Sequence, residues 1–211
     1  MIKIEIINVT VYGQNCRLIY DDKTRKAFVV DPGGNAELIK STADKLDLTI
    51  EKILITHGHL DHIGAVKILQ DLTGAKIIGP SIEEKKLISS LPTQALMLGL
   101  PLPEGFEFES VYDGEQIEIL KDLFLKVITT PGHTKGGVCY YCEQERFLLS
   151  GDTLFCGSIG RTDFPGGSYD EIISSIKEKL LILPDETKVL SGHGEDSTIG
   201  YERSYNPFCG D

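Results

Sequence analysis

The seven residues THGHLDH (56–62) contain three of the five histidines of this 211-residue chain, together with one aspartate. They continue directly from the short apolar run KILIT (52–56), which is typical of a buried strand, so the cluster begins where a strand ends. Such a cluster fits a metal centre, a catalytic acid–base group or a polar loop. The other strand ends of the chain distinguish these alternatives.

Three further polar side chains follow apolar strands in the same way. His133 follows KVITTPG (126–132), Asp152 follows RFLLSG (146–151), and His193 follows KVLSG (188–192). A lone histidine is more often a hydrogen-bonded core residue, but here that explanation has to hold five times together. The neighbouring glycines suit loops that approach one centre closely. We therefore expect all five histidines to lie in loops that converge on a metal site.

The donor set of five histidines and two aspartates, Asp61 and Asp152, is large enough for two divalent ions. Zinc is the expected metal, with iron or manganese as alternatives. The i, i+4 histidine spacing of helical zinc proteases is absent. A Ser–His–Asp triad is disfavoured because there is no G-x-S-x-G motif and no histidine is spare to act as base. The same shortage favours a substrate with a good leaving group, such as a thioester that releases a thiolate.

Composition narrows the class of protein. Hydrophobic content of 41% and charged content of 25% predict an ordinary globular fold, which we expect to be a single domain over residues 1–211. The net charge of −11 disfavours binding to nucleic acid or to an anionic membrane. No signal peptide or apolar run of membrane-spanning length is visible, so a cytoplasmic monomer or small homo-oligomer is expected. The five scattered cysteines predict buried free thiols, and CYYC (139–142) is interpreted as strand rather than as a redox or zinc motif.

The apolar pattern predicts two β-rich halves with helices, and therefore two packed sheets covered by helices on the outside. The segment 91–105 is rich in proline and glycine and is expected to be irregular, with a lid or an interface as its hypothetical role. Strands are predicted at 2–11, 16–20, 27–31, 52–56, 75–79, 106–111, 116–120, 123–129, 137–142, 146–150 and 187–191, and helices at 35–48, 63–74, 81–91 and 168–181.

The order THxHxDH (56–62), GH (132–133), GDTLF (151–155) and GHG (192–194) resembles the metallo-β-lactamase superfamily over nearly the whole chain. The resemblance implies an α+β fold, the αββα sandwich, with a two-metal site between the sheet edges. It also implies the ligand sets. One ion is held by His57, His59 and His133, the other by Asp61, His62 and His193, and Asp152 bridges the two.

Finer motifs look like those of the short bacterial glyoxalase II-like hydrolases: QNC, VDPGG, THGHLDHIG, PGHTKG, GDTLF, GRTDFPGG and GYERSYNPF. Hydroxyacylglutathione hydrolases proper carry an additional C-terminal helical domain, which we expect to be missing here. Persulfide dioxygenases, which use one iron, are a close alternative, and a metal-binding sensor or scaffold is an alternative outside enzymes. Zinc β-lactamases of the commonest kind are less similar, because they place a cysteine where Asp152 stands.

This resemblance leads to a hypothesis about the reaction. A hydroxide shared by two metal ions attacks the carbonyl of a small-molecule thioester, such as S-lactoylglutathione, and releases a free acid and a thiol. Asp61 ligates one ion and orients the nucleophile, which makes it the candidate catalytic residue. Arg161, in GRTDF, is a candidate for binding a substrate carboxylate, with an ion pair to Asp163 as the alternative.

Overall fold

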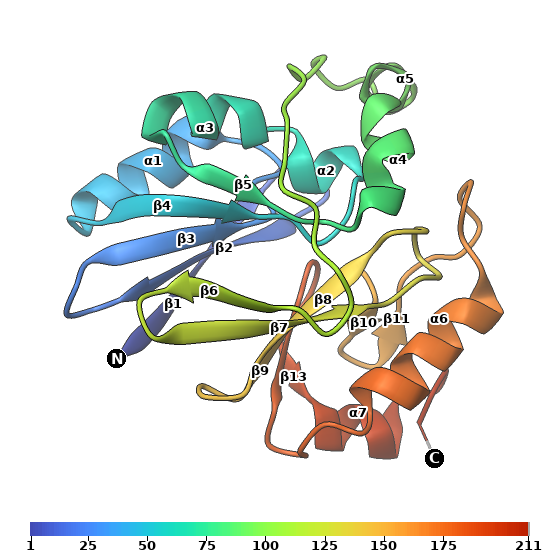
Figure 1. Cartoon of the computed structure of the whole chain (residues 1–211). Coiled ribbons are helices and arrows are strands. Elements are labelled where there is room, and N and C mark those ends of the chain that lie inside the picture. The colour runs from blue at the N-terminus through green and yellow to red at the C-terminus, as the bar shows by residue number, and fades with distance from the viewer. Residues whose placement is uncertain (211) are drawn as a thin grey trace.

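Two β-sheets pack face to face in the computed structural model, which describes residues 1–210 (Figure 1). The first sheet has the strand order β1-β2-β3-β4-β5 and the second the order β13-β12-β9-β8-β7-β6. Helices cover the outer face of each sheet, so the layers follow the order helix, sheet, sheet, helix. This confirms the predicted αββα sandwich with two mixed sheets.

The first sheet is antiparallel at one side and parallel at the other. The strands β1 (Ile2–Val9), β2 (Gln14–Asp21) and β3 (Lys26–Val30) form the predicted antiparallel meander. Parallel pairing then joins β3 to β4 (Thr49–Leu54) and β4 to β5 (Lys76–Ile78). Because parallel strands need crossover connections, helices α1 (Ala36–Lys45) and α3 (Val66–Thr73) return the chain across the sheet.

The second sheet is antiparallel from β6 to β9 and gains one parallel strand, β12, which pairs with β9. Its strand β7 alternates buried and exposed side chains, with Leu123, Leu125 and Val127 directed inward, as expected for a strand with one solvated face. The strands are β6 (Gln116–Leu120), β7 (Leu123–Thr129), β8 (Val138–Cys142), β9 (Phe147–Gly151), β12 (Lys188–Ser191) and β13 (Ser197–Thr198).

Three apolar clusters hold the layers together. One lies between the first sheet and its helices α1 and α3, the second lies between the two sheets, and the third lies under the helices of the second sheet. Those outer helices are α6 (Tyr169–Ser175), which continues as the π-helix η2 (Ile176–Leu180), and α7 (Ile199–Tyr205). The amphipathic spacing of α1, with Ala36, Ile39 and Ala43 buried, is what seats it on the sheet.

Three predicted segments differ in the structure. The stretch expected to be irregular begins with a helix, α5 (Leu91–Leu98), because Pro92 stands in its first turn and Gly99 ends it in the left-handed conformation. Residues 106–111 do not form a strand. They run beside β5, which has only three residues, and make a single bridge between Ile78 and Glu109. The predicted helix 81–91 is divided into η1 (Ile82–Glu84) and α4 (Lys85–Ser89).

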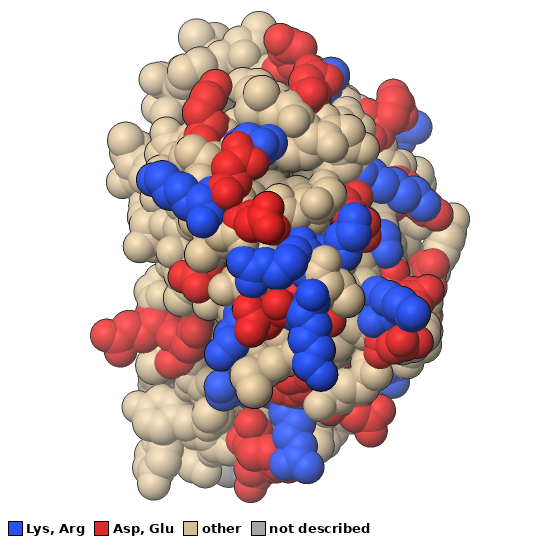
Figure 2. Space-filling view, turned by 90° about the vertical axis from the view of Figure 1, so that its left-hand side faces the viewer, with Lys and Arg blue, Asp and Glu red and all other residues tan. Residues whose placement is uncertain are grey.

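The charged surface and the state of the cysteines agree in part with the predictions made from the composition. Acidic and basic side chains are interspersed on the face shown in Figure 2, without a large patch of one sign there. Every helix within residues 1–210 is too short or too polar to span a lipid bilayer. All five cysteines are free, and Cys139 and Cys142 are buried in β8. Cys156 is exposed, contrary to the prediction, because it lies in the tight turn between β10 (Leu154–Phe155) and β11 (Ser158–Ile159).

Candidate metal centre

The predicted ligands come from four strand ends that meet at one edge of the sandwich. His57 and His59 follow β4, His133 lies between β7 and β8, Asp152 follows β9 and His193 follows β12. Asp61 and His62 lie in the one-turn helix α2 (Leu60–Ile63), which corrects the expectation that all the histidines occupy loops. The turn begins directly after His59, so it directs His62 back toward the strand end.

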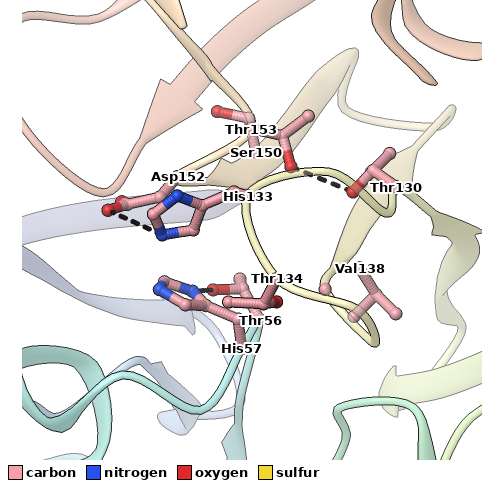
Figure 3. A pocket seen from close by; sticks show the side chains of 10 residues that line it. Thr56, His57, Thr130, His133, Thr134, Val138, Ser150, Asp152 and Thr153 are labelled. Atoms are coloured by element: carbon pink, nitrogen blue, oxygen red, sulfur yellow. Dashed lines mark hydrogen bonds and ion pairs between the residues drawn. The ribbon is translucent and has the colours of Figure 1, made fainter. Parts of the chain in front are cut away.

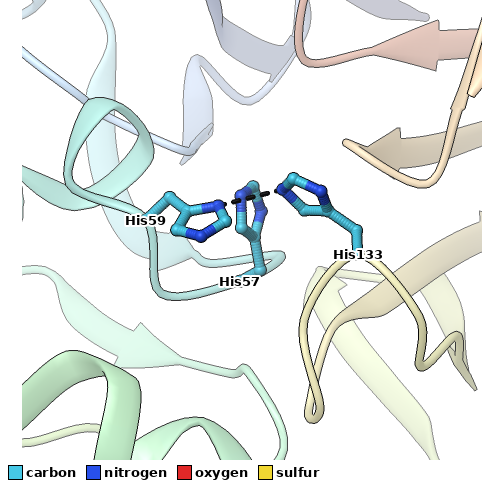
Figure 4. A group of neighbouring side chains, drawn as sticks. All are labelled: His57, His59 and His133. Carbon is cyan, nitrogen blue, oxygen red and sulfur yellow. Dashed lines mark hydrogen bonds between the residues drawn. The ribbon is translucent and has the colours of Figure 1, made fainter. Parts of the chain in front are cut away.

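Three imidazoles form the first group, which we call the imidazole trio: His57, His59 and His133. One ligand atom from each lies within 4.8 Å of the others. Figure 4 shows the three rings turned toward one another from two separate loops. Nδ1 of His59 and Nε2 of His133 are 2.9 Å apart, and the ring centroids of His57 lie 4.9 Å from those of both partners. This convergence of aromatic nitrogens is suited to one divalent cation.

A second group, the mixed trio, consists of Asp61, His62 and His193, whose ligand atoms also lie within 4.8 Å of one another. Nε2 of His193 is 3.3 Å from Oδ2 of Asp61 and 3.3 Å from Nε2 of His62. This trio includes a carboxylate, so its chemistry differs from that of the first.

Asp152 lies between the two trios. Its Oδ1 is 3.2 Å from Nε2 of His62, and its Oδ2 is 3.7 Å from Nε2 of both His133 and His193. Figure 3 shows its carboxylate beside the His133 ring, in front of a small cavity lined by the hydroxyls of Thr130, Ser150 and Thr153. A carboxylate between two groups of ligands could be shared by two ions, as the sequence resemblance predicts for Asp152.

The unpaired polar atoms of the centre provide a test of whether these residues fit metal ions. Nε2 of His57 is buried and has no hydrogen-bond partner among residues 1–210. Oδ1 of Asp152 is also buried without a well-aligned hydrogen bond among these residues, and its ion-pair contact is Nε2 of His62 at 3.2 Å. Leaving a buried polar atom unpaired costs about 1–3 kcal/mol. Both atoms are lone-pair donors in a set of imidazoles and carboxylates, so divalent cations would satisfy them. The residues therefore fit the predicted metals.

The two trios differ in how the protein shifts their pKa values. Burial holds the pKa of His57 well below its ordinary value, and burial followed by the neighbouring His133 lowers the pKa of His59 to about 3. Burial acts in the same direction on His62 and His193, but carboxylates outweigh it. Asp152 and Asp31 raise the pKa of His62, and the hydrogen bond to Asp61 raises that of His193.

The two carboxylates respond in the opposite direction. Burial alone would raise the pKa of Asp152, but the imidazoles, with His62 first, hold it well below its usual value. The pKa of Asp61 is also lowered, because the hydrogen bond from His193 outweighs burial. Both side chains are therefore anionic at neutral pH, as metal ligands must be.

Outer hydrogen bonds orient four of the rings, and Nδ1 of His57 donates to the hydroxyl of Thr56 at 3.0 Å. The most informative bond comes from a residue that the sequence did not single out. Asp31 accepts from Nδ1 of His62 at 3.0 Å, and it also accepts from the backbone N–H and the hydroxyl of Thr56. The backbone carbonyl of Arg161 accepts a hydrogen bond from Nδ1 of His133 at 2.7 Å, and that of Tyr12 accepts one from Nδ1 of His193 at 3.3 Å. Such partners fix the tautomer and leave Nε2 free for a metal. The signal for Asp31 was its place in VDPGG, directly after strand β3.

Arg161 lies at the rim of this centre. Its guanidinium donates to both carboxylate oxygens of Asp163, at 2.9 and 2.7 Å, and stands 4.3 Å from the ring centre of Phe164. That ring in turn lies edge-on to His59. The geometry is thus the ion pair that the sequence offered as the alternative role for Arg161. Binding of a substrate carboxylate stays a prediction.

Comparisons with known proteins agree with this geometry. The family model described as the metallo-beta-lactamase superfamily matches residues 9–193. The hydroxyacylglutathione hydrolase GloC of Haemophilus influenzae is 45% identical over 207 residues, which cover 97% of each chain. Among solved structures, the B3 metallo-beta-lactamase BLEG-1 superposes with a TM-score of 0.89 at 35% identity, covering 99% of both chains. TTHA1623, solved in a di-iron-bound form, gives a TM-score of 0.87 at 30% identity over 97% of this chain and 99% of its own.

Proposed function

Because the chain belongs to the metallo-β-lactamase superfamily, we propose that it is a metal-dependent hydrolase of small acyl thioesters. The substrate is S-lactoylglutathione or a related thioester, and the products are a free acid and a thiol. The observation that carries the proposal is the pair of trios around Asp152, which together contain every histidine of the chain. The near full-length similarity to a hydroxyacylglutathione hydrolase supports the substrate class.

The imidazole trio and the mixed trio would each hold one divalent ion, with the Asp152 carboxylate between them. Zinc is the proposed metal, and iron is the main alternative because a solved structural relative is described as di-iron-bound. When bound, such ions lower the pKa of water to near neutrality and polarise a carbonyl oxygen.

Asp61 has the position and the charge for a catalytic role. Its side chain is only partly buried, and the hydrogen bond from His193 helps to hold its pKa low, so the carboxylate is ionised at neutral pH. An ionised carboxylate can accept a hydrogen bond from the attacking water and orient it toward the thioester carbonyl. Asp61 therefore serves both as ligand and as the residue that orients the nucleophile.

The kind of leaving group is inferred from the fact that the two trios use all five histidines. All five imidazoles belong to the two trios, so none is free to protonate a departing group. A thiolate leaves without such help, because a thiol has a pKa of about 8.5, far below that of an amine or alcohol. This favours thioesters over amides and oxygen esters.

The decisive experiment combines metal analysis with three assays on the same preparation. We expect two metal ions per chain and hydrolysis of S-lactoylglutathione that is lost on treatment with a chelator and restored by Zn²⁺ or Fe²⁺. The parallel assays are hydrolysis of a β-lactam and oxygen uptake with glutathione persulfide. Oxygen uptake with one iron per chain would instead identify a dioxygenase, and β-lactam turnover without thioester turnover would identify a lactamase.

A further inference from the structure

Glu84 is a buried carboxylate that joins two loops of the metal centre. It ends η1, in the segment that continues through α4 to α5 and lies beside α2 in Figure 1, and its side chain is almost fully buried. One oxygen accepts from the backbone N–H of Gly58 at 2.8 Å, and the other accepts from the N–H of Gly136 at 2.7 Å. These two glycines are far apart in sequence and belong to different sheets' loops.

The two glycines are placed next to the imidazole trio. Gly58 stands between His57 and His59, and Gly136 lies three residues after His133 in the loop before β8. A single carboxylate therefore connects both loops that supply this trio. Because each of its two oxygens accepts from the backbone of one loop, the carboxylate joins the two loops through one compact, planar group.

The packing at both glycines shows that this contact leaves no room for side chains. A Cβ atom at Gly58 would lie 2.9 Å from Oε2 of Glu84, and one at Gly136 would lie 2.6 Å from its backbone nitrogen and 2.9 Å from its Cγ. Glycine at both positions permits the close approach. The loops and the carboxylate thus fit together as one unit.

Gln94 holds the same loop from helix α5. Its side-chain amide donates to the carbonyl of Gly58 at 3.2 Å, and its side-chain oxygen accepts from the N–H of Leu60 at 3.0 Å. Both the N–H and the carbonyl of Gly58 are therefore bound by side chains of the segment 82–98. This contact gives that segment a role that its sequence did not reveal.

We propose that Glu84 is a positioning residue, which fixes the loop of His57 and His59 relative to the loop of His133 and thereby sets the metal affinity of the imidazole trio. Gln94 secures the first of these loops from the other side. The inference rests on the proposed metal-dependent function, because it concerns the same centre. It assigns no contact between Glu84 and the substrate or the metal.

The test compares Glu84→Gln with Glu83→Gln, which changes the exposed neighbouring carboxylate in the same way. Glutamine has the size of glutamate but offers only one acceptor oxygen, so it can hold one of the two N–H groups and not both. The first measurement is amide hydrogen exchange of Gly58 and Gly136 in the metal-free protein. The second is Zn²⁺ titration by calorimetry, which counts the sites and gives their affinities.

We expect Glu84→Gln to speed exchange of at least one of the two amides and to weaken one of two Zn²⁺ sites by about 10- to 100-fold, while Glu83→Gln matches the wild type. Glu84→Asp, which keeps both oxygens, should recover part of the lost affinity. Unchanged affinity in Glu84→Gln would overturn the proposal, whether or not exchange is faster. A wild-type protein without Zn²⁺ binding would reject the proposed function itself, and the exchange rates would still show whether Glu84 joins the loops.

Discussion

The two trios of the candidate metal centre would attract a cation by different means. The mixed trio works by charge, because Asp61, Asp152 and Asp31 all lie in contact with its histidines. The imidazole trio contains no carboxylate of its own and depends on holding three neutral rings in place. The protein accordingly ties its loops through Glu84 and Gln94. Changes of charge should therefore affect the mixed trio most, and changes of geometry the imidazole trio.

The scaffolds behind the trios differ as well. The loop that carries His193 is held by β2, where Asn15 donates to the carbonyl of Gly194 at 2.9 Å. The fully buried Arg17 donates to the carbonyl of Ser191 at 3.0 Å and pairs with Asp196. One trio is thus braced by strand β2, and the other by the segment 82–98. We therefore expect that the two proposed metal sites can be weakened separately.

The largest effect should come from the one residue that both trios share. Asp152→Asn keeps the size of the side chain but removes the charge that lies close to three imidazoles, so both ions should be lost with a fall in affinity of more than about 100-fold each. Metal analysis after gel filtration and thioester hydrolysis are the measurements. Asp71→Asn, at an exposed position, is the matched control. Retention of one ion at normal affinity would show that Asp152 belongs to a single trio.

A pair of single-ligand variants should then separate the trios. His59→Asn removes a ligand of the imidazole trio, and His193→Asn removes one of the mixed trio, so each should reduce the metal content from about two ions to about one. Calorimetry with Zn²⁺ would show which binding step disappears in each variant. Loss of both ions in either variant would mean that the two trios bind metal as one cooperative unit and are not separate sites.

The metal-free protein should reveal the trios through opposite dependence on pH. The pKa of His59 is lowered to about 3 in the folded protein. Below about pH 6.5 the unfolded chain therefore binds a proton at this residue that the folded chain does not bind, and the free energy of unfolding falls as the pH falls. The pKa of His193 is raised, so its contribution is fully present below about pH 6.5 and is lost as the pH rises through its folded pKa. The slope for one group is at most about 1.4 kcal/mol per pH unit.

Urea unfolding with a chelator at pH 5.5, 6.5 and 7.5 would measure this difference. His59→Asn should lessen the loss of stability on the acid side, while His193→Asn should lessen the loss on the alkaline side. Equal changes at all three pH values in both variants would contradict the assignment of the shifts to these two rings.

The parts of the centre that were predictable are those that depend on strand ends. His57, His133, Asp152 and His193 each follow an apolar run, and parallel or adjacent strands bring such ends to one edge of the sandwich. Asp31 could have been found in the same way, because it directly follows β3. Its partner His62 could not be deduced locally, since helix α2 decides where that ring points.

The role of Glu84 could not be predicted from the sequence. It stands beside Glu83 in SIEEKK, a pattern that fits any solvated first turn of a helix, and only the packed fold shows that one carboxylate is buried while the other is exposed. The helix α5 was missed for a related reason. Proline suggests a loop in isolation, but at Pro92 it occupies the first turn of a helix, where its missing N–H costs nothing.

The smallest expected effect concerns Arg161, at the rim of the imidazole trio. Its guanidinium is exposed and already paired with Asp163, so solvent screens its charge, and Arg161→Ala should raise KM for S-lactoylglutathione by no more than about fivefold. The value of kcat should stay close to that of the wild type, because the side chain donates to Asp163 and to none of the residues of the two trios. Asp163→Asn, which frees the guanidinium, should lower KM if Arg161 binds the substrate carboxylate. Unchanged KM in both variants would show that the Arg161 side chain does not bind substrate. The role of Arg161 would then be that of its backbone carbonyl, which orients His133.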